Sequence, residues 1–400
     1  MPRCSLCGRP LTAGRCLPCD ARRWFNLVYG EFVHREIAGL AILVGVTIVA
    51  FLVTRSVAAN NDDLRRRQAA MWFETAQEAL QSGSLEPAVV TLRRAVSRDP
   101  ENKEYRLALA RALAESRLDD EAKRVLFILR EAEPEEPETN LQFARIEARG
   151  SDADASRRYY ESALAGLWQP ERAGERRAVR LELIDFLLAR GERDRALSEL
   201  LVLDANLPAD TAAQVQVGRL FLSADDPRQA LNRFEGALAA DPDDGSALAG
   251  AGESAFALGD YARARRYFNA APRDDERTAE LREVTQFVLS GDPLAPRLAA
   301  NERSRRLLAA LKQATQSLEI CLVGSLVDPR ADLESLRTEA IDFEAAVAAQ
   351  RRGDIRDLID DGVDLIYRIE RSMEPSCRSV TTSLDRALLL IGRLRGFEQP

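Results

Sequence analysis

Residues 69–102 read AAMWFETAQEALQSGSLEPAVVTLRRAVSRDPEN, and this stretch predicts the fold of most of the chain. Small and apolar residues recur at helical spacing on both sides of Gly83. Pro100 stops the second run. We therefore expect helices in this stretch.

The same pattern recurs with a period of 34 residues. Blocks start at Ala69, Lys103, Pro137, Arg177, Thr211 and Gly245. Within them, position 8 and position 20 are mostly small, position 24 is apolar and position 32 is mostly proline. The third block is weaker, with Ser156 at position 20 and Trp168 at position 32, and an insertion at 171–176 then breaks the period. We expect a bend or a lengthened helix at the insertion.

This pattern resembles the tetratricopeptide repeat family over 69–278, as about six repeats. The resemblance implies an all-α fold, an α-solenoid whose inner groove is lined by first-helix positions such as 9 and 12. On this chain, those positions include Arg111, Arg145, Arg219, Leu188, Leu222 and Phe256. The hypothesis is a groove for a peptide or helix with apolar anchors and acidic residues. In the alternative, the arginines are solvated or pair with neighbouring carboxylates.

After the repeats, residues 279–300 read as a connecting helix and linker, and 301–400 as a C-terminal four-helix bundle. Four apolar sets at helical spacing are separated by Asp328-Pro329, Gly353-Asp354 and Glu374-Pro375. Chain direction then places Cys321 and Cys377 at the same end of the bundle. A possible disulfide follows if the region lies outside the cytoplasm; the alternative is two buried free thiols.

Residues 37–54, IAGLAILVGVTIVAFLVT, form an uncharged run long enough to cross a bilayer as a helix. A juxtamembrane amphipathic segment, 23–36, precedes it, with Trp24, Phe25, Tyr29 and Phe32 as an aromatic belt, and a linker, 55–68, follows. The favoured interpretation is a single uncleaved span. The alternatives are a secretory signal cleaved after Val57-Ala58-Ala59, and a buried core helix.

The balance of basic residues indicates the orientation of this span. Six arginines precede it, and four follow it, namely Arg55, Arg65, Arg66 and Arg67. Basic residues favour the cytoplasmic side. We therefore expect a bacterial inner-membrane protein with a cytoplasmic N-terminus and with repeats and bundle in the periplasm. The composition, rich in alanine and with arginine far above lysine, is typical of GC-rich bacterial genomes.

The first 22 residues hold four cysteines, Cys4, Cys7, Cys16 and Cys19, in the spacing C-x2-C-x8-C-x2-C. Two such turns supply four thiolates to one tetrahedral zinc ion. The stretch resembles the short zinc-ribbon modules at the N-termini of many bacterial membrane proteins. We expect a structural Zn²⁺ site; the alternative is a redox-active pair of C-x-x-C motifs.

The sequence argues against catalysis and against nucleic-acid binding. His34 is the only histidine, and no nucleotide-binding or hydrolase motif is present. The first 36 residues carry six arginines against three acidic residues, a net charge of +3. Because the whole chain has a net charge of −8, the remainder has a net charge of −11. A nucleic-acid binder would instead present a basic face.

These features predict a membrane-anchored scaffold or adaptor that binds protein partners through its repeats. One alternative is a regulatory adaptor of envelope assembly facing the cytoplasm. It resembles the lipopolysaccharide-assembly regulators that combine one span, tetratricopeptide repeats and a Cys4 site, although in those proteins the span does not separate metal site from repeats. Another is a module that responds to zinc or redox state across the membrane.

Overall fold

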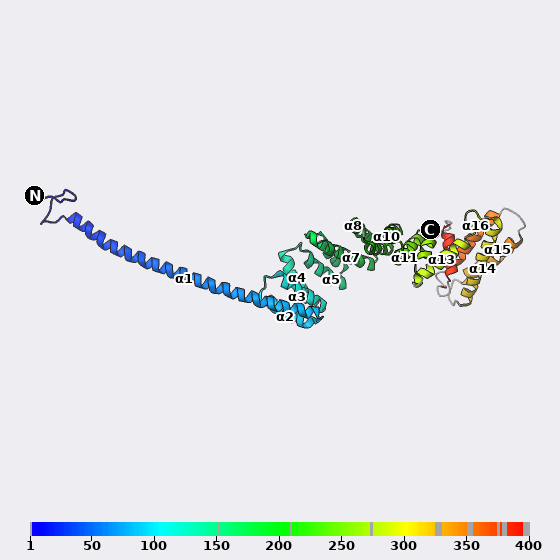
Figure 1. Cartoon of the computed structure of the whole chain (residues 1–400), viewed down its shortest axis with the longest axis horizontal. Helices are drawn as coiled ribbons and strands as arrows, with labels where there is room; N and C mark the ends of the chain where they lie inside the picture. The colour runs from blue at the N-terminus through cyan, green and yellow to red at the C-terminus, as the bar shows by residue number, and fades with distance from the viewer. Residues whose placement is uncertain are drawn as a thin grey trace. The chain divides into compact units, whose positions relative to one another are not determined.

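A computed structural model describes residues 2–150, 152–208, 210–272, 275–324, 330–349, 355–373, 377 and 382–394. Within these residues every regular element is a helix, and two isolated bridges near the N-terminus are the only β pairings (Figure 1). The predicted all-α fold class is confirmed. The chain divides into two compact units, Met1–Pro170 and Glu171–Pro400.

The first unit contains three antiparallel helix pairs. Its helices are α1 (Leu17–Gln81), α2 (Leu85–Arg98), α3 (Lys103–Glu115), α4 (Asp119–Ala132), α5 (Pro137–Arg149) and α6 (Ala153–Ala165). The C-terminal end of α1 pairs with α2, α3 with α4, and α5 with α6. Fully buried Leu92, Leu113 and Leu126 lie in the core between the pairs.

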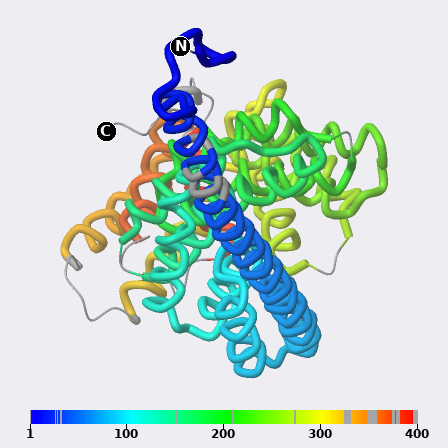
Figure 2. Tube along the Cα trace, turned by 90° about the vertical axis from the view of Figure 1, so that its left-hand side faces the viewer, coloured from blue at the N-terminus to red at the C-terminus, as the bar shows by residue number. Residues whose placement is uncertain are grey.

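Helix α1 is one continuous helix of 65 residues (Figure 2). The predicted linker, 55–68, is therefore helical, and so is the predicted juxtamembrane segment. For the linker, the physical reason is that no glycine or proline lies between Gly45 and Gly83 to interrupt the hydrogen-bond ladder. Among the described side chains of α1, only those from Ala69 onward include buried ones.

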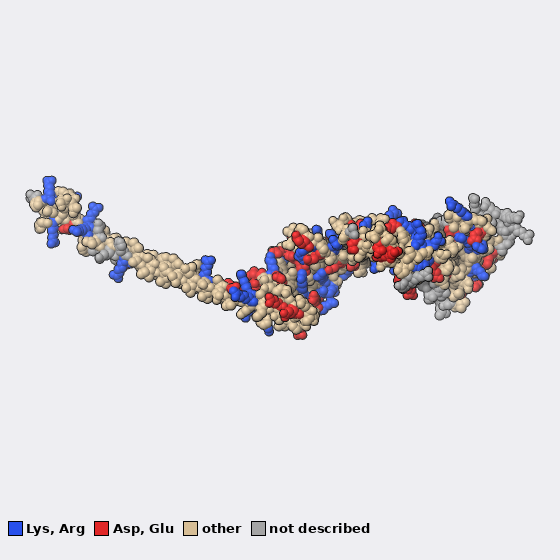
Figure 3. Space-filling view, in the orientation of Figure 1, with Lys and Arg blue, Asp and Glu red and all other residues tan. Residues whose placement is uncertain are grey.

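The apolar part of α1 has no protein around it. An 18-residue window within Arg35–Gln81 has a mean hydropathy of 2.7, and none of it is buried. Figure 3 shows this stretch without charged side chains, between basic residues on both sides. Phe25 and Tyr29 stack at 4.7 Å just before it, while the side chain of Phe32 lies outside the described part of the chain. The helix is long and apolar enough to cross a membrane.

The second unit follows a short 3₁₀ turn, η1 (Pro170–Arg172), which contains the division point. Its helices are α7 (Ala173–Ala189), α8 (Arg193–Asp204), α9 (Thr211–Ser223), α10 (Pro227–Ala240), α11 (Gly245–Ala257), α12 (Tyr261–Ala270), α13 (Glu276–Gly291), α14 (Ala300–Gly324), α15 (Arg330–Ala349), α16 (Ile355–Met373) and α17 (Ser383–Leu394). The insertion at 171–176 forms the end of the 3₁₀ turn and the first turn of α7, which reaches 17 residues.

Acidic residues start many of these helices. The side chains of Asp152, Asp226, Asp244 and Asp260 each accept a hydrogen bond from the backbone N–H three residues later. Such a cap satisfies one of the donors that a helix start leaves without a partner. Aspartate thus caps α6 in the first unit and α10, α11 and α12 in the second.

The turn inside each pair repeats one backbone conformation. Position 15 has a positive φ in five blocks: Gly83 (73°), Arg117 (63°), Gly191 (75°), Asp225 (66°) and Gly259 (74°). Glycine adopts this conformation without strain, whereas a side chain costs about 1 kcal/mol or more there. The turn geometry is therefore kept even where the residue does not favour it.

The small residue at position 8 makes room for the large one at position 24. A Cβ built on Gly252 would lie 2.5 Å from the ring of Phe268, and one built on Gly218 would lie 2.9 Å from the ring of Phe234. Both rings are fully buried. The first two blocks combine Ala76 with Leu92 and Ala110 with Leu126 at these positions. In these blocks and in the last two, a small residue at position 8 thus leaves room for the side chain at position 24. The third and fourth blocks depart from this balance, with Tyr160 at position 24 and Ile184 at position 8.

The last helices pack on the final repeat rather than standing apart. Val284 and Val288 of α13 share one apolar cluster with Tyr261 of α12 and with Leu311 and Leu318 of α14. The segment predicted as a connecting helix and linker is therefore part of the core. Helices α14 to α17 pack together as the sequence predicts, with α13 against α17. The three predicted turns at 328–329, 353–354 and 374–375 lie outside the described residues.

Candidate metal centre and groove

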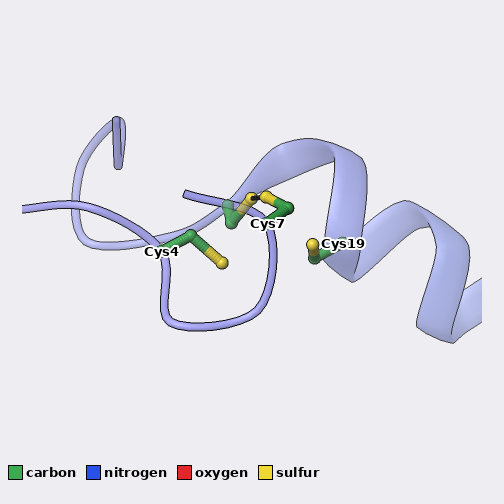
Figure 4. A group of neighbouring side chains, drawn as sticks. Cys4, Cys7 and Cys19 are labelled. Carbon is green, nitrogen blue, oxygen red and sulfur yellow. Dashed lines mark hydrogen bonds between the residues drawn. The ribbon is translucent and has the colours of Figure 1, made fainter. Parts of the chain in front are cut away.

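Four cysteine sulfurs converge in the N-terminal segment of the first unit. The Sγ atoms of Cys4, Cys7, Cys16 and Cys19 all lie within 4.8 Å of one another, and those of Cys7 and Cys16 are 3.4 Å apart. Figure 4 shows the three labelled side chains directed toward a common point, with Cys19 on the first turn of α1. The structure thus brings all four predicted ligands together.

Local backbone geometry positions the two cysteine pairs differently. Around the first pair, the N–H of Cys4 donates to the carbonyl of Arg9 at 2.8 Å, and the N–H of Gly8 donates to the carbonyl of Cys4 at 2.9 Å. Gly8 adopts a positive φ of 70° to close this turn. The second pair opens α1 instead, because Cys16 is the residue just before the helix and Pro18 lies in its first turn. The cluster is therefore attached directly to α1.

The spacing of the sulfurs fits a tetrahedral metal ion. Zinc–sulfur bonds of about 2.3 Å at tetrahedral angles place neighbouring sulfurs about 3.8 Å apart, and the observed separations bracket that value. Four sulfur ligands leave no position for a water molecule, so the arrangement suits a structural metal rather than a catalytic one.

The proton affinities of the thiols fit the same interpretation. Hydrogen bonds from the backbone at Leu6 and Cys7 lower the pKa of Cys4 to about 7. Sharing protons with the sulfurs of Cys7 and Cys16 raises the pKa of Cys19 to about 12. The Cys4 thiol therefore ionises readily, whereas Cys19 keeps its proton because it hydrogen-bonds to the neighbouring sulfurs. A bound cation displaces such protons, since a metal takes cysteine as the thiolate.

A groove lies on the first helices of the last two repeats in the second unit. It has a volume of about 680 Å³, and α9, α11 and the start of α13 line it. Arg219 and Leu222 of α9 face it together with Glu253 of α11 and Asp275. Glu253 pairs with Arg277. Within the described part of the chain, the guanidinium of Arg219 has no ion-pair partner. The groove thus presents a cation beside an apolar side chain.

The two other arginines on groove positions belong to the first unit. Arg111 of α3 forms an ion pair of 2.5 Å with Glu138, whose side chain is largely buried on α5. Glu138 also accepts a hydrogen bond from Gln142 at 2.8 Å. Pairing with a neighbouring carboxylate, the alternative that the sequence left open, therefore applies to Arg111. Arg145 of α5 is half-buried and also has interactions.

The predicted apolar strip is only partly available. Leu188 and Leu222 are half-buried against the core of the middle repeats, and only Leu222 also lines the groove. Phe256 packs edge-on against Tyr261, with ring centroids 5.3 Å apart, and joins the C-terminal core. Leu188 and Phe256 therefore serve mainly as packing residues.

Cys321 and Cys377 form a disulfide in the structure, with their Cα atoms 5.8 Å apart. Cys321 lies near the end of α14, and Cys377 follows α16, so both lie at one end of the bundle. Both side chains are buried in the C-terminal core. The pairing closes a loop of 56 residues.

Two buried acidic side chains of this bundle have no counterpart in the sequence predictions. Glu370 of α16 and Asp385 of α17 are 4% and 1% exposed. Asp385 accepts hydrogen bonds from Ser317 at 2.7 Å and from the hydroxyl of Thr382 at 2.8 Å. Among the described residues, Oε1 of Glu370 has no hydrogen-bond partner; burial and the nearby Asp385 raise the pKa of Glu370 to about 9. Each acid flanks an apolar run in the sequence, which gives no sign of burial.

Comparison with known proteins supports the repeat assignment. A family profile described as tetratricopeptide repeat matches residues 79–140 and 221–285. No curated protein matches the chain. Among solved structures, PilW, described as a widely conserved type IV pilus biogenesis factor, is 19% identical, with a TM-score of 0.38, over 50% of this chain and 90% of that one.

Two further solved structures are similar in the same way. YrrB, described as a tetratricopeptide repeat protein with an unusual peptide-binding site, is 18% identical over 49% of this chain and 95% of that one, with a TM-score of 0.34. A tetratricopeptide repeat protein from Parabacteroides merdae is 13% identical over 69% of this chain and 99% of that one, with a TM-score of 0.37. The two profile matches lie one in each compact unit, so each unit contains a segment similar to tetratricopeptide repeats, a class of helical repeat that serves as protein-interaction scaffolds.

Proposed function

We propose that the protein is a membrane-anchored scaffold that binds protein partners through its repeats and has no catalytic role of its own. The observation that carries the proposal is the open groove of the second unit, where Arg219 lies beside Leu222 without an ion-pair partner among the described residues. A guanidinium binds a carboxylate through two parallel hydrogen bonds. An apolar neighbour adds affinity by removing a partner side chain from water. The groove therefore suits a peptide segment that places an acidic residue next to an apolar one.

The anchor in this proposal is residues 37–54 of α1, in contact with the lipid bilayer. Its support is an apolar window that lacks any burying protein, because an isolated soluble helix with that surface would aggregate. The six arginines before the run and the four after it favour a cytoplasmic N-terminus in a bacterial inner membrane. The repeats and the bundle then lie in the periplasm.

The four N-terminal cysteines hold a structural Zn²⁺ in this proposal. Cys4, Cys7, Cys16 and Cys19 supply the four sulfurs, and the ion fixes the fold of a segment with almost no apolar core. A reducing cytoplasm keeps these thiols available for a metal, whereas the periplasm permits the Cys321–Cys377 bond. The cysteine chemistry and the arginine count thus favour the same orientation.

A charge reversal in the groove tests partner binding. A photo-crosslinking amino acid at position 222, in the full chain in native membranes, should capture a partner. The substitution Arg219→Glu should abolish that capture. Arg228→Glu is the matched control, because Arg228 is an exposed arginine on the neighbouring helix α10 and lies outside the groove. Equal capture in both variants would show that the groove does not bind the partner.

One observation supports a second candidate function, a zinc- or redox-responsive module that signals across the membrane. The cysteine cluster is attached to the same unbroken helix that forms the first element of the repeats. A change in the cluster would therefore be transmitted mechanically, without a flexible joint. Loss of zinc that leaves partner capture at position 222 unchanged would argue against this second function.

A further inference from the structure

The part of α1 between the apolar run and the first repeat is a bare helix. Every side chain from Arg55 to Gln68 is exposed, and α2 is the only helix with substantial contacts to α1 in the described chain. Over 55–71 only three large apolar side chains are exposed, Val57 (63%), Leu64 (49%) and Met71 (53%). We call these three residues the stalk stripe.

The stalk stripe has the spacing of a coiled coil. Its members are seven residues apart, and Asn60 and Arg67 fill the intermediate positions in alternating steps of three and four. Apolar residues that recur at every seventh position keep one face of a helix toward a parallel partner. Continued backward, the same steps reach Val53, Ala50 and Val46, which line a shallow apolar groove of about 650 Å³ on the surface of α1. The stripe therefore continues from the stalk into the apolar run.

The stripe is turned away from the rest of the protein. At about 100° per residue, Met71 lies roughly 160° around the helix from Ala69, which is fully buried against α2. The charged side chains of Arg55, Asp62 and Arg66 fall by the same count on the side opposite the stripe. Arg67, at an intermediate position on the same face as the stripe, is charged, and it pairs with Asp63 at 2.7 Å. A second helix thus has an open and largely uncharged approach.

The chemistry of the stripe fits a second copy of this chain. Two copies anchored by the same apolar run share one direction and one depth in the bilayer, so each stripe residue meets its own counterpart. Asn60 would face Asn60, and an amide side chain both donates and accepts a hydrogen bond with an identical partner. A single polar layer of this kind sets the register of a coiled coil. Small residues such as Ala50 allow close approach of helices within a membrane.

We propose that α1 pairs in parallel and in register with α1 of a second copy, along the stalk stripe and its continuation to Val46. The proposal rests on the proposed membrane anchoring for the shared depth of the two helices. Its consequence is that one assembly presents at least two sets of repeats, so that a partner with two binding segments is held by avidity.

Cysteine crosslinking in native membranes tests the pairing. Val57→Cys and Leu64→Cys in the full chain should give a covalent dimer under mild oxidation, at a yield at least fivefold above Asp62→Cys, which lies on the opposite side of the helix. The chain without an added cysteine gives the background from its native thiols. Equal yields at positions 57, 62 and 64 would overturn the proposal, as would a product with a different protein at positions 57 and 64.

A second variant separates a true interface from chance collision. In the Val57→Cys chain, Leu64→Asp should lower the dimer yield at least fivefold, whereas the matched change Arg65→Asp outside the stripe should not. No effect of Leu64→Asp would overturn the pairing. Membrane fractionation of the same samples distinguishes a failure of the membrane anchoring from a failure of the pairing. A chain that is absent from the membrane fraction refutes the anchoring. A chain that is present there but gives no dimer refutes only the pairing.

Discussion

The two groups of cysteines in this protein work in opposite surroundings. Cys4, Cys7, Cys16 and Cys19 lie in a segment where, among residues 2–16, only Cys16 is buried. Cys321 and Cys377 lie inside a core to which six helices, α12 to α17, contribute. In the proposed function the first group needs an ion to hold its fold, while the second adds a covalent link to a fold that apolar packing already supports. The same residue type thus gives a metal centre or a crosslink according to the core around it.

Removing one N-terminal cysteine should have the largest effect. Cys7→Ser should abolish stoichiometric zinc binding, because binding by four thiolates contributes on the order of 10 kcal/mol to the folding of such a small segment. The measurement is the zinc content of the purified full chain, with about one ion per chain expected before the substitution. Cys321→Ser serves as the control, since it should leave the zinc content unchanged. A full zinc content in Cys7→Ser would refute the four-sulfur site.

Breaking the C-terminal disulfide should have the next largest effect. The double change Cys321→Ser and Cys377→Ser should lower the free energy of unfolding of the bundle by up to about 4 kcal/mol, because a loop of 56 residues is no longer closed in the unfolded chain. The bundle should still fold, since its apolar core is intact. Urea unfolding followed by helical content measures this. A reductant should lower the free energy of unfolding of the parent chain but not that of the double variant. An equal response of the two proteins would contradict the disulfide.

The buried acid of the bundle predicts a pH dependence. The pKa of Glu370 in the folded state, about 9, is above the ordinary value of 4.5, so the folded chain holds a proton that the unfolded chain releases. Its contribution to stability is therefore fully present below pH 4.5 and is lost as the pH rises toward 9. Glu370→Gln should remove this loss and stabilise the bundle by on the order of 2 kcal/mol at pH 8.

The check for Glu370 is a series of urea unfolding curves from pH 5 to pH 9. The difference between Glu370→Gln and the parent should grow steadily with pH. Glu319→Gln, at an exposed position on α14, is the matched control and should show no such growth. A constant difference for Glu370→Gln across this range would show that the residue does not hold a proton in the folded protein.

The smallest predicted effect concerns an ion pair on the bundle surface. Arg368 of α16 pairs with Glu339 of α15 and with Asp364 at 2.9 Å. Because these groups are partly exposed, Arg368→Ala should cost no more than about 1 kcal/mol and the cost should shrink at high salt. Arg337→Ala, at an exposed position on α15, provides the comparison in the same unfolding assay. If Arg368→Ala destabilised the bundle more than loss of the disulfide does, the proposed order of these two contributions to stability would be wrong.

Sequence patterns predicted those features that depend on local chemistry. The period of 34 residues predicted the helix pairs because most blocks combine a small residue at position 8 with an apolar one at position 24, as Gly252 and Phe268 do. The C-x2-C spacing likewise predicted the convergence of four sulfurs. In both cases the residues that decide the geometry lie in the same repeat or within a few residues of one another.

Features that depend on distant neighbours could not be predicted in this way. The sequence left open whether Arg111 lines a free groove or pairs with a carboxylate, because its partner Glu138 comes from the next repeat. Arg117 and Asp225 adopt the same left-handed turn as the glycines, because tertiary packing imposes it against their own preference. The burial of Glu370 likewise depends on how α16 meets α17, which periodicity within one helix does not define.

The most direct test of the account is protease treatment of intact spheroplasts carrying the full chain with an epitope before Cys4. The account predicts that protease removes the repeats and the bundle while a fragment of about the first 55 residues, with its epitope, stays protected until the membrane is opened. Survival of the whole repeat region in intact spheroplasts would contradict it, because both groups of cysteines would then share one compartment.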